Sequence, residues 1–431
     1  MSKKIHFRKA ELRLLLLLSL IYCVGIALIK MSHGEKLDIS VMMTALPLLI
    51  AFWTTHTLLT ISDSKTDEML MPLFAFLSII GHIEIYRLEP ALAFKQVLFI
   101  LGGFALFNIW YLKGFDYRIW EDYKYLVLFS GIAIQIAVMI LGTEINGAKL
   151  WFRIGSINFQ PVEVVKILVV VFLASYLKQK KEFITSHPKR WLDSLSFKYL
   201  LPLIAILGCC ELILVVQKDM GMALLLFGTF MCLFYIATER IGMIVCAFLL
   251  FLMSSYALIQ KFPHVHVRFA VWLDPWQDPN GSGYQILQSL FALSAGGFWG
   301  TGLGMGSPTL IPAVHTDFVF AAIGEEMGFL GAMAVILAYL FLVHRIFKVS
   351  LQCHDEFGSL FAAGLGALLA CQVFIITGGS IKFIPMTGIT LPFISYGGSS
   401  VISNFFLMAL VFQIAEQAGK KKSQLLQMKA S

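Results

Sequence analysis

Long apolar stretches, each followed by a short polar segment, set the pattern of this chain. A helix needs roughly 20 mostly apolar residues to cross the hydrocarbon core of a bilayer. The pattern predicts an all-α polytopic membrane protein. We expect about twelve membrane-spanning helices, at 14–32, 41–61, 69–86, 96–112, 125–143, 162–177, 197–216, 221–238, 242–260, 317–344, 358–378 and 399–416.

The composition supports this fold class. Hydrophobic residues make up 58% of the 431 residues and charged residues only 14%, and the mean hydropathy is +0.80. Soluble domains carry about 25% charged residues. No small-residue cleavage site follows the first apolar stretch, so we interpret it as a retained helix and not as a secretory signal. The 7 Cys form no CxxC pair, which argues against a disulfide framework or a zinc site.

The distribution of basic residues predicts the orientation. If both termini lie on one side of the membrane, that side holds two thirds of the 33 Lys and Arg residues. The positive-inside rule then places both termini in the cytoplasm. Basic runs at 1–9, 178–190 and 420–422 carry most of this signal. The net charge of +7 therefore reflects topology, with some attraction to anionic membrane lipid, and does not indicate a nucleic-acid partner.

The predicted extracytoplasmic segments contain most of the informative polar residues. They are 144–161, a large loop at about 261–316, and a Gly- and Pro-rich segment at 379–398. Within the large loop, residues 284–300 are amphipathic but too short to span, as expected for a re-entrant or interfacial helix. No loop is long enough for an independent domain, so we expect the chemistry at the membrane or its outer surface.

Two aspartates in the large loop are candidates for acid–base chemistry. Asp274 and Asp278 each precede a proline in a Trp-flanked turn, which is tightened by Asn280 and Gly281. In a turn of this kind an aspartate often caps its own backbone. It could instead be a carboxylate held at the mouth of a cavity as a general base. Composition alone does not choose between the two.

A second group of charges surrounds the start of the predicted helix at 162–177. Glu163 and Lys166 are three residues apart, so they share a helical face just inside the membrane. They could form an ion pair that only stabilises the helix, or they could face a cavity, because intramembrane charges are expensive. Lys149 and Arg153, beside Trp151, could be interface anchors or could hold a lipid phosphate.

Two further groups lie towards the same face. His315 and Asp317 open the predicted helix at 317–344, with Glu325 and Glu326 buried further along it. The run from Ser395 to Ser400 enters the last span. In that run, Gly397 and Gly398 could hold an anion at a helix start or could simply allow close helix packing, and Ser399 or Ser400 could cap the helix.

Taken together, these segments resemble the SEDS family of bacterial envelope proteins (RodA, FtsW and SpoVE). The matching segments follow the family's order from about residue 70 to 416: NGAKLWFRIGSINFQPVEVVK, QKDMGMALLLF, DPWQDPNGSGYQILQS, GTGLGMGS, HTDFVFAAIGEEMG and PMTGITLPFISYGGSS. The first two spans look like an addition to the family's usual ten. We therefore divide the chain into 1–66 (an N-terminal segment and two added helices), 67–418 (the SEDS core) and 419–431 (a basic cytoplasmic tail).

The resemblance implies a peptidoglycan glycosyltransferase of the bacterial cytoplasmic membrane. Such an enzyme polymerises lipid II, a disaccharide-pentapeptide on undecaprenyl pyrophosphate, at the outer face and acts with a class B penicillin-binding protein. The family's loop aspartate maps onto Asp278, which would be the general base. The predicted substrate-binding residues are Lys149, Trp151, Arg153, Glu163, Lys166, Arg268, Gln285, His315, Asp317, Glu325, Ser395, Gly397, Gly398 and Ser399. No cofactor is implied with certainty, although Mg²⁺ or Mn²⁺ could assist at the pyrophosphate.

Departures from the family pattern leave the proposed base in place. Val162 stands where the family usually has Ser, and Lys218 stands where it has Pro.

Two alternative functions remain, and mutants would distinguish each of them from the polymerase. A lipid II flippase would depend on the buried acids, and a scaffold for the penicillin-binding protein would tolerate the loss of Asp278.

Overall fold

The computed structural model describes residues 8–32, 34, 39–145, 147–155, 157–185 and 194–430. Parts of the basic runs at 1–9 and 178–190, namely 1–7 and 186–190, lie outside the described residues. The described part contains the helices α1 (Lys9–Ser32), α2 (Ile39–Ile61), α3 (Leu70–Leu88), α4 (Pro90–Lys113), α5 (Ile119–Asp122), α6 (Lys124–Leu141), α7 (Val162–Thr185), α8 (Ser194–Val216), α9 (Met220–Thr238), α10 (Ile241–Lys261), α11 (Pro263–Leu273), α12 (Tyr284–Gly296), α13 (Val319–Gln352), α14 (Glu356–Ser380) and α15 (Gly398–Ala430).

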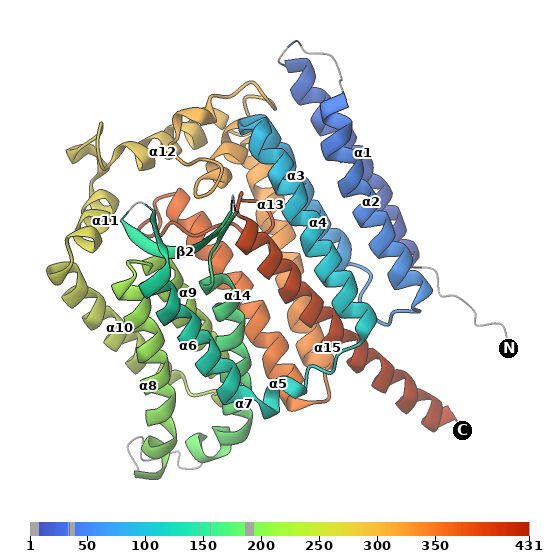
Figure 1. Cartoon of the computed structure of the whole chain (residues 1–431), viewed down its shortest axis with the longest axis vertical. Coiled ribbons are helices and arrows are strands. Elements are labelled where there is room, and N and C mark those ends of the chain that lie inside the picture. The colour runs from blue at the N-terminus through green and yellow to red at the C-terminus, as the bar shows by residue number, and fades with distance from the viewer. Residues whose placement is uncertain are drawn as a thin grey trace.

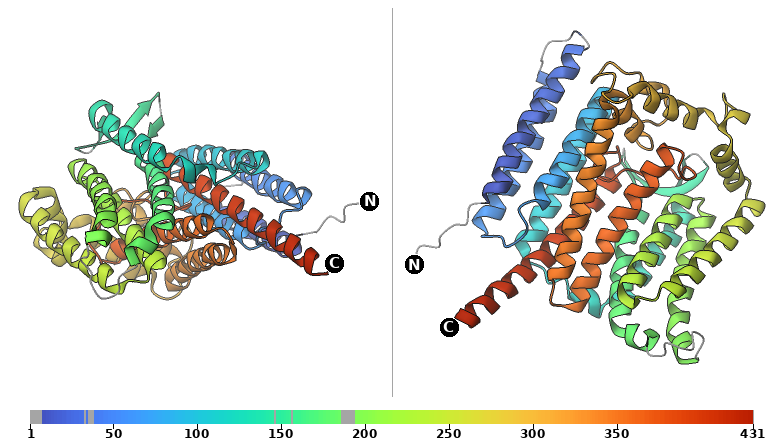
Figure 2. Two further views of the ribbon diagram at one scale, coloured as in Figure 1. Left: turned by 90° about the horizontal axis from the view of Figure 1, so that it is seen from below. Right: turned by 180° about the vertical axis from the view of Figure 1, so that it is seen from behind.

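The long helices form a bundle with two different ends (Figure 1). One end bears α11, α12, the short 3₁₀ helices Pro275–Gln277 and Pro308–Leu310, and a small sheet; we call it the loop end. At the opposite end, α15 runs on beyond the bundle (Figure 2). Helix α12 has only 13 residues and lies across the loop end and not along the bundle, as predicted for a helix too short to span.

Eleven helices in the described part are long and apolar enough to cross a membrane. The remaining predicted span, 162–177, forms the helix α7. Its first turns carry Glu163 and Lys166, and both are almost completely enclosed, with 1% and 0% of their surface exposed. Because α7 packs against α6, α8, α9 and α14, it is a central helix surrounded by protein.

The sequence pattern did not predict the small sheet. Strands β1 (Thr143–Ile145), β2 (Ala148–Ile154) and β3 (Ile157–Phe159) pair antiparallel in the order β1-β2-β3. Gly147 and Gly155 take the left-handed conformation at its two turns, with φ of 76° and 61°. The sheet links α6 to α7 at the loop end.

The two N-terminal helices pack on one edge of the core. Helix α1 packs against α3, and α2 packs against α4. At the end opposite the loop end, Arg8 and Glu11 form a buried ion pair, and Arg8 also donates to the backbone oxygen of Thr66. These contacts join the hairpin of α1 and α2 to the segment that leads into α3.

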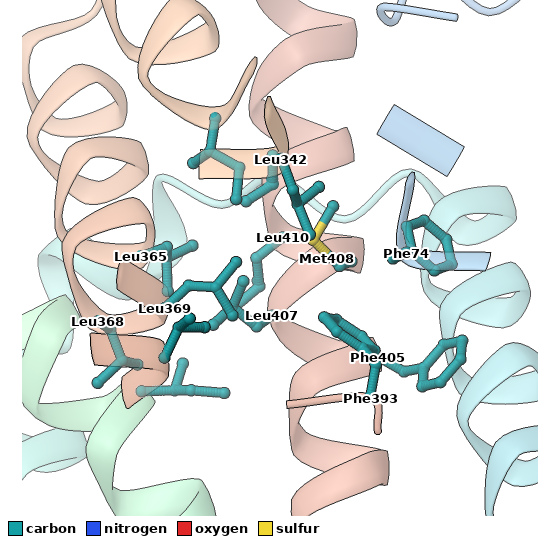
Figure 3. Close-up of a cluster of buried hydrophobic side chains, with 14 of the residues drawn as sticks. Phe74, Leu342, Leu365, Leu368, Leu369, Phe393, Phe405, Leu407, Met408 and Leu410 are labelled. Carbon is teal, nitrogen blue, oxygen red and sulfur yellow. The ribbon is translucent and has the colours of Figure 1, made fainter. Parts of the chain in front are cut away.

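Aromatic and aliphatic side chains fill the centre of the bundle (Figure 3). Phe74 of α3 lies 5.6 Å from Phe405 of α15 and 5.9 Å from Phe393, measured between ring centroids. Phe393 belongs to the irregular segment before α15, so this segment packs into the core.

Helix α13 is interrupted at Gly328, where the backbone takes φ +67°. A Cβ there would lie 2.2 Å from the backbone nitrogen of Gly300, so the loop after α12 touches the helix at this point. The amides of Thr301 and Gly302 donate to the carbonyl oxygens of Glu325 and Glu326. The Gly-rich loop therefore satisfies backbone groups that the interrupted helix leaves free.

Candidate active site

A pocket of about 160 Å³ opens at the loop end; we call it the polar pocket because Arg268, Ser282, Gln285 and Asp317 line it among apolar residues. It brings together three of the predicted site residues, namely Arg268 from α11, Gln285 from α12 and Asp317 just before α13. Its other lining residues are Val267, Val271, Trp272, Ser282, Ile286, Met386 and Gly388. Because these residues come from separate parts of the chain, the folded loop end creates the pocket.

Asp278 lies beside this pocket in an exposed turn. Its Oδ2 accepts hydrogen bonds from the backbone amide of Ser282, at 2.7 Å, and from the Ser282 hydroxyl, at 3.0 Å. These bonds favour the charged form and lower the pKa of Asp278. Since Ser282 also lines the pocket, an ionised carboxylate is held next to it. Asp274 instead accepts from the amide of Trp276 and caps a 3₁₀ turn.

Arg268 is the cationic residue among those that line the polar pocket, and it acts on two nearby carboxyls. Its guanidinium donates to the carbonyl oxygen of Thr387 at 3.2 Å. Burial raises the pKa of Asp317 to about 6, against the opposing effects of the Thr316 hydrogen bond and of Arg268. Burial also raises the pKa of Asp219, at the start of α9, to about 6, and Arg268 again opposes the shift. Arg268 therefore acts electrostatically on two carboxyls whose pKa burial raises to about 6.

An apolar groove of about 860 Å³ meets the polar pocket. Its walls are α8, α9 and α10, and α11 and residues 384–387 close it towards the loop end. Arg268 and Met386 line both spaces. Helix α10 has no buried residue, so its sides face the bilayer and the groove. A polar chamber and a lipid-accessible groove therefore share one arginine.

Glu163 and Lys166 form a buried ion pair within α7, separate from this pocket. The Lys166 Nζ lies 2.5 Å from the Glu163 Oε2 and also donates to Gln372 of α14. Gln372 in turn donates to the carbonyl oxygen of Thr390, and Ser403 donates to Glu163. In this conformation the pair braces the segment before α15 and lines neither space, so its predicted contact with substrate stays a prediction.

Glu325 and its neighbour Glu326 hold the Gly-rich loop. The Glu325 Oε1 accepts from the amide of Ser307, and the Glu326 Oε2 accepts from the amide of Gly304. Arg87 of α3 pairs with the Glu326 Oε1 at 2.8 Å. The partners of these two buried acids are therefore backbone amides and one arginine.

The run from Ser395 to Ser399 is used for packing. Ser395 donates to the carbonyl oxygen of Thr316, and the Ser399 hydroxyl accepts from the amide of Gln160. A Cβ on Gly398 would lie 2.7 Å from the Phe99 ring, and Gly397 lies just before α15. These contacts tie the start of α15 to α4 and to the residue after β3, and they tie Ser395 to the segment before α13, so the close-packing alternative describes the local geometry.

The remaining four predicted residues lie at the loop end but outside the polar pocket. Lys149 and Arg153 are exposed on β2, and Trp151 between them is half-buried. The His315 ring lies edge-on to Tyr396, with the ring centroids 5.9 Å apart, and burial lowers the pKa of His315. None of these four lines the polar pocket described above.

Three residues with clear roles were not among the sequence candidates. Ser282 fixes Asp278, Gln372 completes the Lys166 network, and Arg87 partners Glu326. Arg87 and Gln372 carried a usable signal, because a polar side chain in or beside an apolar span needs a partner. Among the described residues, no three His, Cys, Asp or Glu side chains gather as a metal site, so we derive no step through a divalent cation.

Comparison with known proteins identifies the family. The family described as "Cell cycle protein", which groups FtsW, RodA and SpoVE, matches residues 64–420. The chain is 35% identical to the peptidoglycan glycosyltransferase RodA of Mycobacterium tuberculosis, over 95% of this chain and 91% of that protein. It is 31% identical to the stage V sporulation protein E of Bacillus subtilis, over 82% of this chain and 97% of that protein.

The fold is also similar to a solved structure. A chain in a structure described as a peptidoglycan synthase complex that coordinates polymerization and crosslinking superposes with a TM-score of 0.70 and 27% identity, covering 82% of this chain and 98% of that one. The protein belongs to the FtsW/RodA/SpoVE family, the SEDS family that the motifs resemble. It is a multi-pass membrane enzyme of the glycosyltransferase class.

Proposed function

We propose that the protein polymerises lipid II into glycan strands at the loop end of the bundle, which faces away from the cytoplasm. The observation that carries this proposal is the meeting of the polar pocket and the apolar groove at Arg268. A lipid-linked sugar pyrophosphate has the same division into an anionic head and a long apolar chain. The distribution of basic residues supports the orientation, because it places both termini in the cytoplasm.

In the proposed reaction, the 4-hydroxyl of the acceptor sugar attacks the anomeric carbon of the donor. The bond between that carbon and the pyrophosphate oxygen breaks, and the configuration inverts. Asp278 takes the hydroxyl proton, for which it must be ionised; the hydrogen bonds from Ser282 favour that form. Undecaprenyl pyrophosphate leaves with the bonding electron pair.

Arg268 would stabilise the negative charge that develops on the leaving pyrophosphate. A guanidinium offers several donors in a planar fork that suits phosphate oxygens, and a fixed cation in a partly dry site is worth more than one in water. The apolar groove would hold part of the undecaprenyl chain, the pyrophosphate would lie where the groove meets the pocket at Arg268, and the sugars would occupy the pocket. Gln285 and Asp317, which line the same pocket, are candidates for contacts with the sugars.

We further propose that a class B penicillin-binding protein is the partner that cross-links the new strands. Support comes from the solved complex, whose description joins polymerization to crosslinking. The chain matches 98% of the superposed chain in that complex, so it contains nearly all of the region that the superposed chain could offer to a partner.

The test uses the full chain in proteoliposomes with labelled lipid II, with and without its penicillin-binding protein. Glycan chains resolved on a gel, lost in Asp278→Ala and retained in Asp274→Ala, would support the polymerase. Asp274 is the matched control because it is also a loop aspartate before a proline. Its carboxylate accepts a hydrogen bond from the amide of Trp276 and not from Ser282. Lipid II that crosses the bilayer without forming glycan would instead indicate a flippase.

A further inference from the structure

The groove between α8, α9 and α10 has one charged residue deep in its wall. Six residues of α8 line it at spacings of three and four, as expected for one helical face: Ile204, Leu207, Gly208, Glu211, Leu212 and Val215. Glu211 is the only ionisable residue among them. A side chain of this kind on a face that otherwise contacts lipid is expensive and usually has a function.

Glu211 has no partner within the described protein. Its Oε1 is buried and accepts no hydrogen bond, and no described Lys, Arg or His side chain lies within ion-pair distance of it. The Thr387 hydroxyl, which also belongs to a residue that lines the groove, is likewise buried and makes no hydrogen bond within the described residues. A carboxyl oxygen that is buried without a hydrogen bond destabilises the fold. The free polar groups of Glu211 and Thr387 therefore point to a ligand.

The depth of Glu211 indicates which part of a ligand it would contact. The Arg268 guanidinium binds the Thr387 carbonyl oxygen, and a Cβ on Gly221 would lie 2.9 Å from that same oxygen. The guanidinium therefore lies level with the first turn of α9. Helix α8 runs antiparallel to α9, so Glu211 lies about one turn deeper, roughly 6 Å along the helix axis. The axial part of the separation between Arg268 and Glu211 is therefore comparable to the length of a pyrophosphate group.

We propose that Glu211, in its uncharged form, donates a hydrogen bond to the chain-proximal phosphate of a polyprenyl pyrophosphate whose outer phosphate binds Arg268. This inference rests on the proposed function, because it takes the groove as the site of the lipid carrier. The uncharged form is required because only a protonated carboxyl can donate a hydrogen bond, whereas an ionised carboxylate would repel the phosphate. Glu211 is thus a specificity residue that distinguishes a pyrophosphate lipid from an ordinary chain.

The experiment measures equilibrium binding of two radiolabelled lipids, undecaprenyl pyrophosphate and undecaprenol, to the full chain in nanodiscs. The variants are Glu211→Gln, Glu211→Leu and Arg268→Ala. Cys209→Leu is the matched control, because Cys209 is on the same helix and exposed, and it does not line the groove. Glutamine can donate a hydrogen bond but leucine cannot, so the pair separates donation from size.

We expect Glu211→Leu to weaken undecaprenyl pyrophosphate binding about tenfold, the loss of one hydrogen bond to a charged group. Undecaprenol binding should be unchanged or tighter, and Glu211→Gln and Cys209→Leu should resemble the wild type. If Glu211→Leu binds both lipids as well as or better than the wild type, the inference is wrong. Should that variant fail to fold, Glu211→Met replaces it with the same expectations.

The same data separate this inference from the proposed function. If Arg268→Ala weakens undecaprenyl pyrophosphate binding while Glu211→Leu does not, only the role of Glu211 fails. If the wild type binds the two lipids equally and Arg268→Ala changes neither, the groove is not a pyrophosphate site. In that case both the role of Glu211 and the proposed binding of the leaving pyrophosphate at Arg268 are overturned.

Discussion

Two groups of charges in this protein show how burial and partners decide a residue's role. Glu163 and Lys166 are enclosed in α7, and each has partners in the protein: Ser403 for the glutamate, Gln372 for the lysine, and each other. Arg268 also has carboxyls nearby, but it lies between a pocket and a groove and makes one hydrogen bond, to a backbone oxygen. The first group holds helices together, and the second has donors left for a ligand.

The largest expected effect comes from breaking the buried pair. Lys166→Met should lower the free energy of unfolding by about 3–5 kcal/mol, because Glu163 would be left buried and unpaired. The double variant Lys166→Met, Glu163→Gln should recover much of the loss. Denaturation in detergent measures both variants, with Lys149→Met as the exposed control. Equal stability of the single variant and the wild type would contradict a structural role for the pair.

Arg268 is expected to behave in the opposite way. Arg268→Ala should weaken undecaprenyl pyrophosphate binding by roughly ten- to a hundredfold, since hydrogen bonds to a charged group are lost. Its unfolding temperature should change less than that of Lys166→Met, because within the described residues the side chain makes one hydrogen bond, to a backbone oxygen. A large loss of stability with unchanged lipid affinity would assign Arg268 to the structural group.

The two acids beside Arg268 make a smaller, pH-dependent contribution. Burial raises the pKa of Asp317 and of Asp219 to about 6. Above that pH both carboxylates are ionised and compete with an anionic lipid for Arg268. Affinity for undecaprenyl pyrophosphate should therefore increase several-fold as the pH falls from about 7.5 to 5.5.

Asp317→Asn provides the control for this pH effect, because the pyrophosphate itself also titrates near pH 6. The part of the pH dependence that belongs to Asp317 should disappear in this variant. The stability of the fold should depend on pH in the same direction as the affinity. Because the pKa of Asp317 is raised in the folded protein, this residue contributes stability that is fully present below pH 3.8 and is lost as the pH rises through about 6. An unchanged profile in Asp317→Asn would exclude that residue as a titrating competitor.

The smallest effect concerns the residue that holds Asp278. Ser282→Ala removes one of the hydrogen bonds that lower the pKa of Asp278 and keeps the backbone bond. The pKa should rise, so the acid limb of the polymerisation rate should move to higher pH. The rate near pH 3 should fall roughly threefold, and at pH 8 it should be unchanged. Equal rates at both pH values would show that the hydroxyl is unimportant.

The sequence predicted the membrane spans because each apolar run is a local property of the chain. It also located Asp278, Arg268, Gln285 and Asp317, but their grouping was implied only by the family resemblance. The Lys166–Gln372 contact joins residues 206 positions apart, so no local pattern could show it. The sheet was missed because its strands are short, and only Gly147 and Gly155 mark its turns.

The central claim is that Asp278, beside the polar pocket, performs the proton transfer while the buried pair does not. The most direct measurement compares the full chain and its Asp278→Asn variant for lipid II binding, glycan formation and unfolding temperature. We predict binding and stability close to the wild type, because Asp278 is exposed, with glycan formation reduced by at least about a hundredfold. Glycan formation at the wild-type rate in Asp278→Asn would contradict the account and leave this aspartate as a turn-forming residue.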